Sequence, residues 1–165
     1  MILILTVGQR QSAWVQDAST DYLSRFPADQ RPTLKEIKSE PRTTGKTVAA
    51  MLKAESERLR AAIPDDTFCI ALDERGKDFT TEAFSKLIEK CRQTYSHIAL
   101  VIGGPDGLDP ELKASCNLNL RLSSMTLPHG LVRVMLAEQL YRAFSLEKNH
   151  PYHRARSDNN RARNL

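Results

Sequence analysis

The amino-acid sequence predicts a single α/β domain with a mostly parallel sheet and helices on both faces. Segments with strand character alternate with segments of helical spacing along nearly the whole chain, and this alternation is typical of parallel sheets. Two strands, at 67–72 and 98–102, are continuous apolar runs, as expected of strands that are covered on both sides. A chain of 165 residues is also long enough to bury about two thirds of its unfolded surface in one core.

The first half of the chain supplies two strands and two helices. The apolar run 2–7 predicts a buried strand that ends at Gly8. Ser12 can cap the helix that follows, and Pro27 stops it. The apolar face predicted for that helix comprises Val15, Ala18, Tyr22 and Phe26. The next elements are a short strand at 33–37, a polar surface loop at 38–46, and a helix at 47–63 with Val48, Met51, Leu52, Leu59 and Ile63 on its apolar face.

The second half continues the alternation. The elements expected in order are a strand at 67–72, a loop at 73–78, a helix capped by Thr80, a strand at 98–102, a glycine-rich loop at 103–107, a short helix after Asp109 and a strand at 118–122. The helix after Thr80 is expected to turn Ala83, Phe84, Leu87, Ile88 and Cys91 inward. Pro110 favours a helix start because the first turn has no partners for its amides. Pro128 and Gly130 then turn the chain into a last helix of about sixteen residues.

This last helix is apolar around its whole circumference. Such a helix must be covered on most sides, and leaving even two of its large side chains in water would cost roughly 3 to 6 kcal/mol. We therefore expect the protein to associate as a dimer. Arg133 stands on an apolar face and needs an anionic partner, which is either a structural ion pair or a ligand. The large side chains concerned are Leu136, Leu140, Tyr141 and Phe144.

The positive charge of the chain lies at its carboxyl-terminal end. The formal net charge is +4. The segment from Lys148 onward has five basic residues against Asp158, which gives the same +4, so residues 1–147 are neutral overall. A basic arm beside a neutral body can bind nucleic-acid phosphates, and the alternative is a tail that is only solvated.

Several classes of protein and site are not expected. Cys69, Cys91 and Cys116 are widely spaced among apolar residues, which predicts reduced and mostly buried thiols. No CxxC motif occurs, and His150 and His153 lack partners for a zinc site, so no metal is expected. The first residues lack a basic leader and a cleavage site, and no apolar run is long enough to span a membrane. We expect a cytoplasmic protein.

Three loops should meet at the carboxyl edge of the sheet, where parallel sheets bind ligands. They are 73–78, 103–107 and 123–128. The glycine loop lacks the glycine spacing of a dinucleotide fingerprint, so it is either a tight turn or a place where a ligand approaches the backbone. Backbone amides and carbonyls of the last loop can hold an adenine by its edge. His129 follows that loop and is either catalytic or a structural hydrogen-bonding residue.

Three motifs carry a resemblance to a known family. They are I-G-G-P-D-G at 102–107, L-S-S-M-T-L-P-H with L-V-R-V-M-L-A-E-Q-L-Y-R-A-F at 122–144, and N-H-P-Y-H-R at 149–154. They closely resemble the ribosomal RNA large subunit methyltransferase H family, and the resemblance covers nearly the whole chain through Arg154. Because family members commonly end near that residue, we divide the chain into a domain at 1–154 and a basic extension at 155–165. The extension is either a further phosphate contact or disordered.

The resemblance implies a SPOUT-class methyltransferase with a carboxyl-terminal trefoil knot, which chain physics alone would not suggest because knots are essentially absent among folds. It also implies a homodimer, S-adenosylmethionine as methyl donor, and N3 of a pseudouridine in 23S rRNA of the assembled ribosome as acceptor. The positions that it implies for the donor site are Leu72, Gly103, Leu122, Ser123, Ser124, Met125, Thr126 and Leu127. These positions lie on or beside the three loops of the sheet edge.

Methyl transfer of this kind needs chiefly orientation of the methyl group and the ring nitrogen, which can be worth up to about 7 to 11 kcal/mol. The N3 proton is weakly acidic, so a nearby base or cation can assist its loss. The catalytic candidates are Tyr152, His153, Arg154, His129 and Arg133. We expect Tyr152 and His153 to cover the donor pocket of the partner subunit; alternatively, both rings pack the tail onto the body. The rival function is a noncatalytic ribosome- or RNA-binding protein that keeps the fold.

Overall fold

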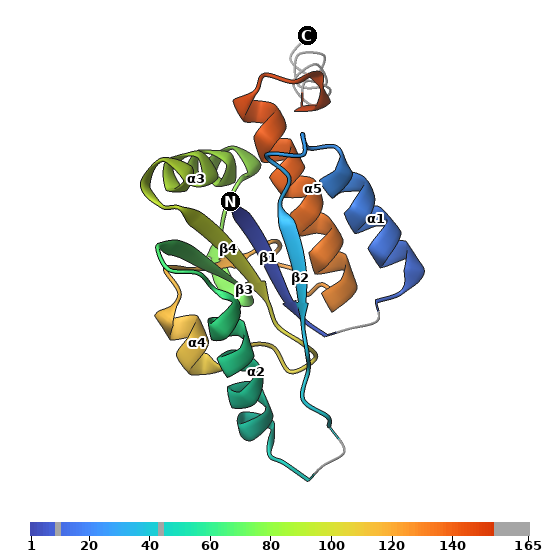
Figure 1. The fold of residues 1–165 in the computed structure, drawn as a ribbon. Coiled ribbons are helices and arrows are strands. Elements are labelled where there is room, and N and C mark those ends of the chain that lie inside the picture. The colour runs from blue at the N-terminus through green and yellow to red at the C-terminus, as the bar shows by residue number, and fades with distance from the viewer. Residues whose placement is uncertain (9–10, 43–44, 154–165) are drawn as a thin grey trace.

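Five parallel strands form one sheet in the order β2-β1-β4-β3-β5 (Figure 1). The computed structural model describes residues 1–8, 11–42 and 45–153. The strands are β1 (Ile2–Val7), β2 (Thr33–Ile37), β3 (Thr67–Asp78), β4 (His97–Ile102) and β5 (Leu118–Arg121). Because every neighbouring pair is parallel, all the carboxyl ends lie at one edge. The predicted α/β class and parallel sheet are confirmed, whereas the trefoil knot stays a prediction.

Helices cover both faces of the sheet, as predicted. In β1, Ile4 enters one core while Leu3 and Leu5 enter the other, because successive side chains of a strand point to opposite faces. The first core lies under α1, α3 and α5, and the second under α2 and α4 (Figure 1). The helices are α1 (Ala13–Ser24), α2 (Val48–Ala62), α3 (Thr81–Thr94), α4 (Pro110–Ser115) and α5 (His129–Glu147), followed by the short 3-10 helix η1 (Pro151–His153).

Local signals determine where three of the helices begin. The side chains of Thr47, Thr80 and Asp109 each accept a hydrogen bond from the amide three residues later, which satisfies one of the free donors of the first turn. Ser12 precedes α1 but makes no such bond. Two predicted core positions are wrong: Val48 and Ala83 lie in first turns and are exposed.

Strand β3 continues beyond the apolar run that predicts it. Leu72 and Lys77 both stand opposite Leu120 of β5, so residues 73–76 bulge out of the ladder before pairing resumes. The segment predicted as a loop is therefore a bulge followed by two paired residues. Its polar sequence gave no strand signal, and the pairing depends on β5, which lies more than 40 residues further along the chain.

Helix α5 is covered within its own chain. It packs against both α1 and α3 over the sheet (Figure 1). Leu136, Leu140 and Tyr141 are buried, and Phe144 is partly buried. The apolar circumference is therefore satisfied inside one subunit and does not by itself require a partner. The dimer stays a prediction, and it now rests on the family resemblance instead of on this helix.

The described residues also bear on the other expected features. No helix among them is long and apolar enough to cross a membrane. In the same part of the chain, no three histidine, cysteine, aspartate or glutamate side chains gather in a way that could hold a metal ion. Cys69 and Cys91 are buried and Cys116 is partly buried, which confirms the prediction of mostly buried thiols. The Sγ atoms of Cys69 and Cys116 lie 3.0 Å apart without a disulfide, and the reduced state stays a prediction.

Candidate functional site

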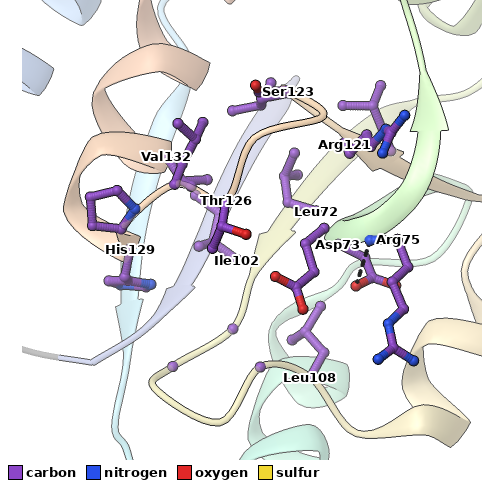
Figure 2. Close-up of a pocket in the computed structure, with 18 of the residues that line it drawn as sticks. Leu72, Asp73, Arg75, Ile102, Leu108, Arg121, Ser123, Thr126, His129 and Val132 are labelled. Atoms are coloured by element: carbon purple, nitrogen blue, oxygen red, sulfur yellow. Dashed lines mark hydrogen bonds between the residues drawn. The ribbon is translucent and has the colours of Figure 1, made fainter.

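A cavity of about 640 Å³ opens at the carboxyl edge of the sheet. The bulge of β3, the glycine loop after β4 and the segment between β5 and α5 form its walls (Figure 2). These are the three loops predicted at this edge, and they come together because β4, β3 and β5 are neighbours in the sheet. Apolar side chains in the lining include Leu72, Ile102, Leu108 and Val132, and polar ones include Asp73, Arg75, Arg121, Ser123, Thr126 and His129.

Most of the residues implied for a donor site lie at this cavity. Those that line it are Leu72, Gly103, Leu122, Ser123, Met125, Thr126 and Leu127. Ser124 is the exception, since it is exposed and does not line the cavity. Met125 is 76% exposed, so its side chain marks the rim rather than the wall. The role of these residues in binding a donor stays a prediction.

The glycine loop is a tight turn. Gly107 has a φ of +80°, a conformation that glycine adopts without steric cost, and its N–H donates to the carbonyl oxygen of Gly104 over 3.0 Å. A Cβ on Gly103 would stand 2.4 Å from the carbonyl oxygen of Gly107. Glycine at 103 is therefore required by the loop's own closure. The sequence offered a tight turn or a ligand contact, and the turn is present.

The cavity also carries charged residues that the sequence analysis did not single out. Lys113 of α4 pairs with Asp73 of the β3 bulge, with 3.4 Å between Nζ and Oδ2. Arg121 makes a two-pronged ion pair with Asp78, at 2.6 and 2.7 Å, and this contact lowers the pKa of the Asp78 carboxyl. The first pair fastens the bulge to α4, and the second holds the last paired residue of β3 to β5. The sequence signal that could have identified Arg121 as a cavity residue is its position as a basic residue at the end of an apolar strand.

His129 joins the start of α5 to two strand ends. Its Nε2 lies 3.5 Å from Oγ1 of Thr6 in β1, and its ring also has a hydrogen bond with the backbone of Gly103. Burial and then the charge of Arg133 lower the pKa of His129 below its usual 6.5, so the ring is neutral at pH 7. This geometry is that of the structural alternative, in which His129 ties the glycine loop to β1.

Arg133 is buried beneath the cavity wall and does not line the cavity. Its side chain is 1% exposed, and Nη1 donates to Oε1 of Glu36 in β2 over 2.9 Å. Among the described residues, Nε and Nη2 have no hydrogen-bond partner. Of the two alternatives for this arginine, an ion pair within the chain is therefore the one observed.

Tyr152 belongs to η1, which follows the end of α5 that is far from the cavity (Figure 1), but its side chain folds back along α5 and packs on Tyr141. Its hydroxyl donates to Oε1 of Glu138 over 3.1 Å, and the guanidinium of Arg142 stands 4.8 Å from the centre of its ring. Desolvation and the Glu138 charge raise the pKa of Tyr152 to about 12. The side chain of His153 and all of Arg154 lie outside the described residues. The described candidates thus lie at the start of α5, as His129 and Arg133, and against its middle, where the Tyr152 hydroxyl meets Glu138.

Comparison with known proteins identifies the family. The family model described as a predicted SPOUT methyltransferase matches residues 1–153. The chain belongs to the SPOUT methyltransferase family. The resemblance inferred from its motifs is thereby confirmed, whereas the division into a domain at 1–154 and an extension at 155–165 stays a prediction.

Curated relatives of this SPOUT methyltransferase share its full domain. Proteins named ribosomal RNA large subunit methyltransferase H are 55% identical in Bordetella pertussis, 50% in Ralstonia pickettii and 49% in Burkholderia vietnamiensis. Each alignment covers 93% of this chain and at least 98% of the relative. At this identity and coverage, the relatives place the chain in the ribosomal RNA large subunit methyltransferase H branch of the family.

Two solved structures share the fold at low sequence identity. A probable methylase family protein from Haemophilus influenzae is 16% identical with a TM-score of 0.56, covering 92% of this chain and 69% of that one. A probable methyltransferase from Bordetella pertussis is 14% identical with a TM-score of 0.54, covering 86% and 95%. These likenesses concern the fold alone, and they agree with the SPOUT architecture expected of the chain.

Proposed function

We propose that this protein is an S-adenosylmethionine-dependent methyltransferase that methylates N3 of a pseudouridine in 23S rRNA of the assembled ribosome. The observation that carries the proposal is the cavity at the carboxyl edge, lined by seven of the eight expected donor-site residues in a chain 55% identical to a protein named for this rRNA activity. A ribosomal substrate also agrees with the cytoplasmic location expected from the sequence.

The residues present fit such a donor. A volume of about 640 Å³ lies within the range of small-molecule sites. Apolar side chains such as Leu72 and Ile102 can enclose a nucleoside, and Leu122, Ser123 and residues 125–127 of the following loop also line the cavity. When bound, S-adenosylmethionine would supply an electrophilic methyl group. The Oγ of Ser123 accepts the N–H of Met125 over 2.9 Å, so this side chain shapes the loop.

The acceptor side of the reaction requires a second subunit. Nine residues of α5 separate His129 at the cavity from Glu138, which holds the Tyr152 hydroxyl, a rise of about 14 Å along the helix. Tyr152, held by Glu138, does not line the cavity of its own chain. If Tyr152, His153 and Arg154 meet the target base, they do so at the cavity of a partner. This is the ground on which we propose a homodimer.

The basic extension supplies a further part of the proposal. Residues 155–165 lie outside the described residues and contain Arg156, Arg161 and Arg163 against Asp158. We assign these arginines to rRNA phosphates. Removing 155–165 should flatten the dependence of ribosome binding on salt, because each lost phosphate contact lowers the logarithmic slope by roughly 0.7 to 0.9.

The proposed function is tested with purified full-length protein, S-adenosylmethionine labelled in its methyl group, and ribosomes from cells that lack this modification. Label should enter 23S rRNA, and digestion followed by mass spectrometry should place it on N3 of one pseudouridine. A protein that binds ribosomes and donor but transfers no label would be the noncatalytic rival. Free 23S rRNA in a parallel reaction shows whether the assembled ribosome is needed.

A further inference from the structure

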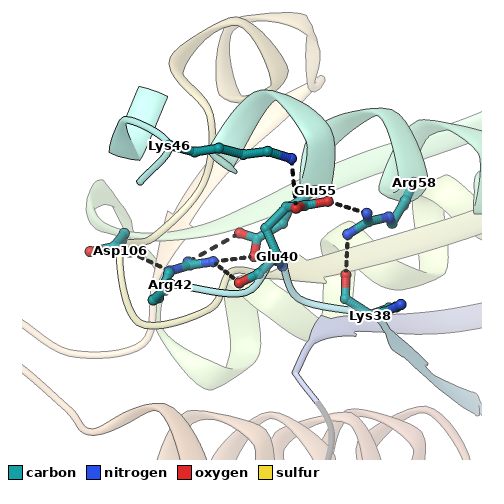
Figure 3. A network of polar contacts seen from close by, with 7 residues as sticks. All are labelled: Lys38, Glu40, Arg42, Lys46, Glu55, Arg58 and Asp106. Carbon is teal, nitrogen blue, oxygen red and sulfur yellow. Dashed lines mark hydrogen bonds and ion pairs between the residues drawn. The ribbon is translucent and has the colours of Figure 1, made fainter. Parts of the chain in front are cut away.

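A network of charged residues lies between α2, the end of β2 and the glycine loop (Figure 3). Its two central carboxylates are almost inaccessible, since Glu40 is 8% exposed and Glu55 is 2% exposed. Glu40 pairs with Arg58 and with Lys46. Carboxylates at such depth are costly unless they are paired and hydrogen-bonded, and both of these have such partners.

Glu55 fixes the orientation of Arg42. One oxygen, Oε2, accepts Nη1 of Arg42 over 2.8 Å, and the other, Oε1, accepts Nη2 over 3.4 Å. The backbone of Glu40 completes the clamp: its carbonyl oxygen accepts the same Nη1 over 2.7 Å, and its N–H donates to Oε2 over 2.9 Å. The planar guanidinium is thereby held in one direction, which a point charge such as lysine would not allow.

The remaining edge of that guanidinium is directed at the cavity wall. Nε of Arg42 donates to Oδ2 of Asp106 over 3.0 Å, and Asp106 belongs to the turn that Gly104 and Gly107 close. This turn lines the cavity proposed for the donor. A buried carboxylate of α2 therefore reaches the glycine loop through a single arginine.

We propose that Arg42, oriented by Glu55, is a positioning residue that holds the glycine loop in the conformation that binds the donor. The inference rests on the proposed function and deepens it. It assigns no contact between Arg42 and the donor, because Arg42 does not line the cavity. Asp106 does line the cavity, so its effect on binding must be separated into a direct contact and a contact through Arg42.

A double-mutant cycle with calorimetric titration of S-adenosylmethionine makes this separation. Arg42→Met and Asp106→Ala should each weaken donor binding by roughly 3- to 10-fold, as expected of one charge-assisted contact that is partly exposed. The double variant should bind no more weakly than either single one, since both remove the same interaction. The matched control is Glu147→Ala, which breaks a similar ion pair with Arg92, at 2.8 Å, between α3 and α5.

Steady-state kinetics on ribosomes distinguish positioning from a general loss of structure. In Arg42→Met the KM for the donor should rise by the same factor as the dissociation constant, while kcat at saturating donor stays within about twofold of wild type. Arg42→Lys keeps the positive charge beside Glu55 but lacks the planar guanidinium. Its KM for the donor should lie between those of the wild type and Arg42→Met. Thermal melting of each variant establishes the folded fraction on which affinities are calculated.

Three results would overturn the inference. Donor affinity unchanged in folded Arg42→Met would remove the positioning role. Loss of affinity in Asp106→Ala alone would mean that Asp106 contacts the donor directly. Independent, multiplying effects of the two substitutions would show that the ion pair is not the shared cause. If the wild-type protein binds no S-adenosylmethionine, it is the proposed function that fails.

Discussion

The two ends of α5 present different chemistry. At the cavity end, His129 is tied to Thr6 and to the backbone of Gly103. Beyond the other end the chain turns back, so that Tyr152 is tied to Glu138 and lies beside Arg142. The nine residues from His129 to Glu138, about 14 Å along the helix, thus separate the cavity-side residues from the Tyr152 hydroxyl. In the proposed homodimer, a reaction that needs both sets in one place would take one set from each subunit.

The electrostatics of the two ends differ as well. Burial lowers the pKa of His129, whereas burial together with the Glu138 charge raises the pKa of Tyr152 to about 12. Both groups are therefore uncharged at pH 7. Neither is prepared to act as a base where it lies, because the ring of His129 is engaged on two sides and the Tyr152 hydroxyl is a donor. His153 and Arg154 are then the remaining candidates for assisting the loss of the N3 proton.

The largest effect is expected from His153→Ala. If His153 accepts or relays the N3 proton at the partner's cavity, methyl transfer in a single turnover should fall by roughly 10²- to 10⁴-fold. Donor affinity should change little, because the donor-side residues are untouched. Single-turnover rates on ribosomes, set beside calorimetric titration of the donor, measure the two effects. Wild-type rates in a folded variant over about pH 6 to 9 would exclude His153 from proton transfer.

Mixing subunits of two variants tests directly whether the donor site and His153 of one reaction come from different subunits. Equal amounts of His153→Ala and a variant that cannot bind donor should exchange subunits and regain roughly a quarter of wild-type turnover, since half of the dimers then hold one intact site. No recovery in a mixture shown to contain mixed dimers would place both ends of the reaction in a single subunit.

An intermediate effect is expected at the cavity end, from Gly103→Ala. The new Cβ would stand 2.4 Å from the carbonyl oxygen of Gly107, so the loop must shift, and donor binding should weaken by roughly 10- to 100-fold on the cost of overpacking. Gly104→Ala is the matched control because its Cβ would meet Val7 at 3.3 Å, a contact that a small shift relieves. Equal affinities of both variants in titration would show that closure of the loop does not govern the site.

The smallest effect is expected on the pH dependence of stability, through the ionisation of Tyr152. The pKa of Tyr152 is raised from 10.0 to about 12 in the folded chain, so the folded state holds its proton more tightly than the unfolded state. The associated stability is present below pH 10 and is lost as the pH rises from 10 through 12. Glu138→Gln removes a charge that opposes tyrosinate and should lower this pKa, which ultraviolet absorbance of tyrosinate measures.

The control for that titration is Glu147→Gln. This variant also removes a carboxylate from α5, but one that is paired with Arg92 and not with Tyr152. Subtracting the titration of Tyr152→Phe isolates one tyrosine from the four in the chain. An identical Tyr152 pKa in Glu138→Gln and wild type would mean that desolvation alone raises it. Unfolding by denaturant at several pH values should show the matching change in stability.

Much of the fold was predictable because its signals are local. The apolar runs of β1 and β4 and the capping side chains of Thr80 and Asp109 act over a few residues, and the structure confirms them. The cavity was predictable one step further, since parallel strands bring their carboxyl ends to one edge. The donor-site assignment needed more, namely the motifs at 102–107 and 122–129 and their resemblance to a family.

The sequence by itself therefore determined the elements, the class of sheet and the edge at which a ligand would bind. Only the tertiary structure decided which distant groups meet: Arg133 with Glu36 across 97 residues, and Arg42 with Asp106 across 64. It also decided that α1 and α3 cover the apolar helix. The physical reason is that periodicity and caps report how a segment presents its own side chains, whereas contacts between segments depend on strand order and crossover, which no local pattern encodes.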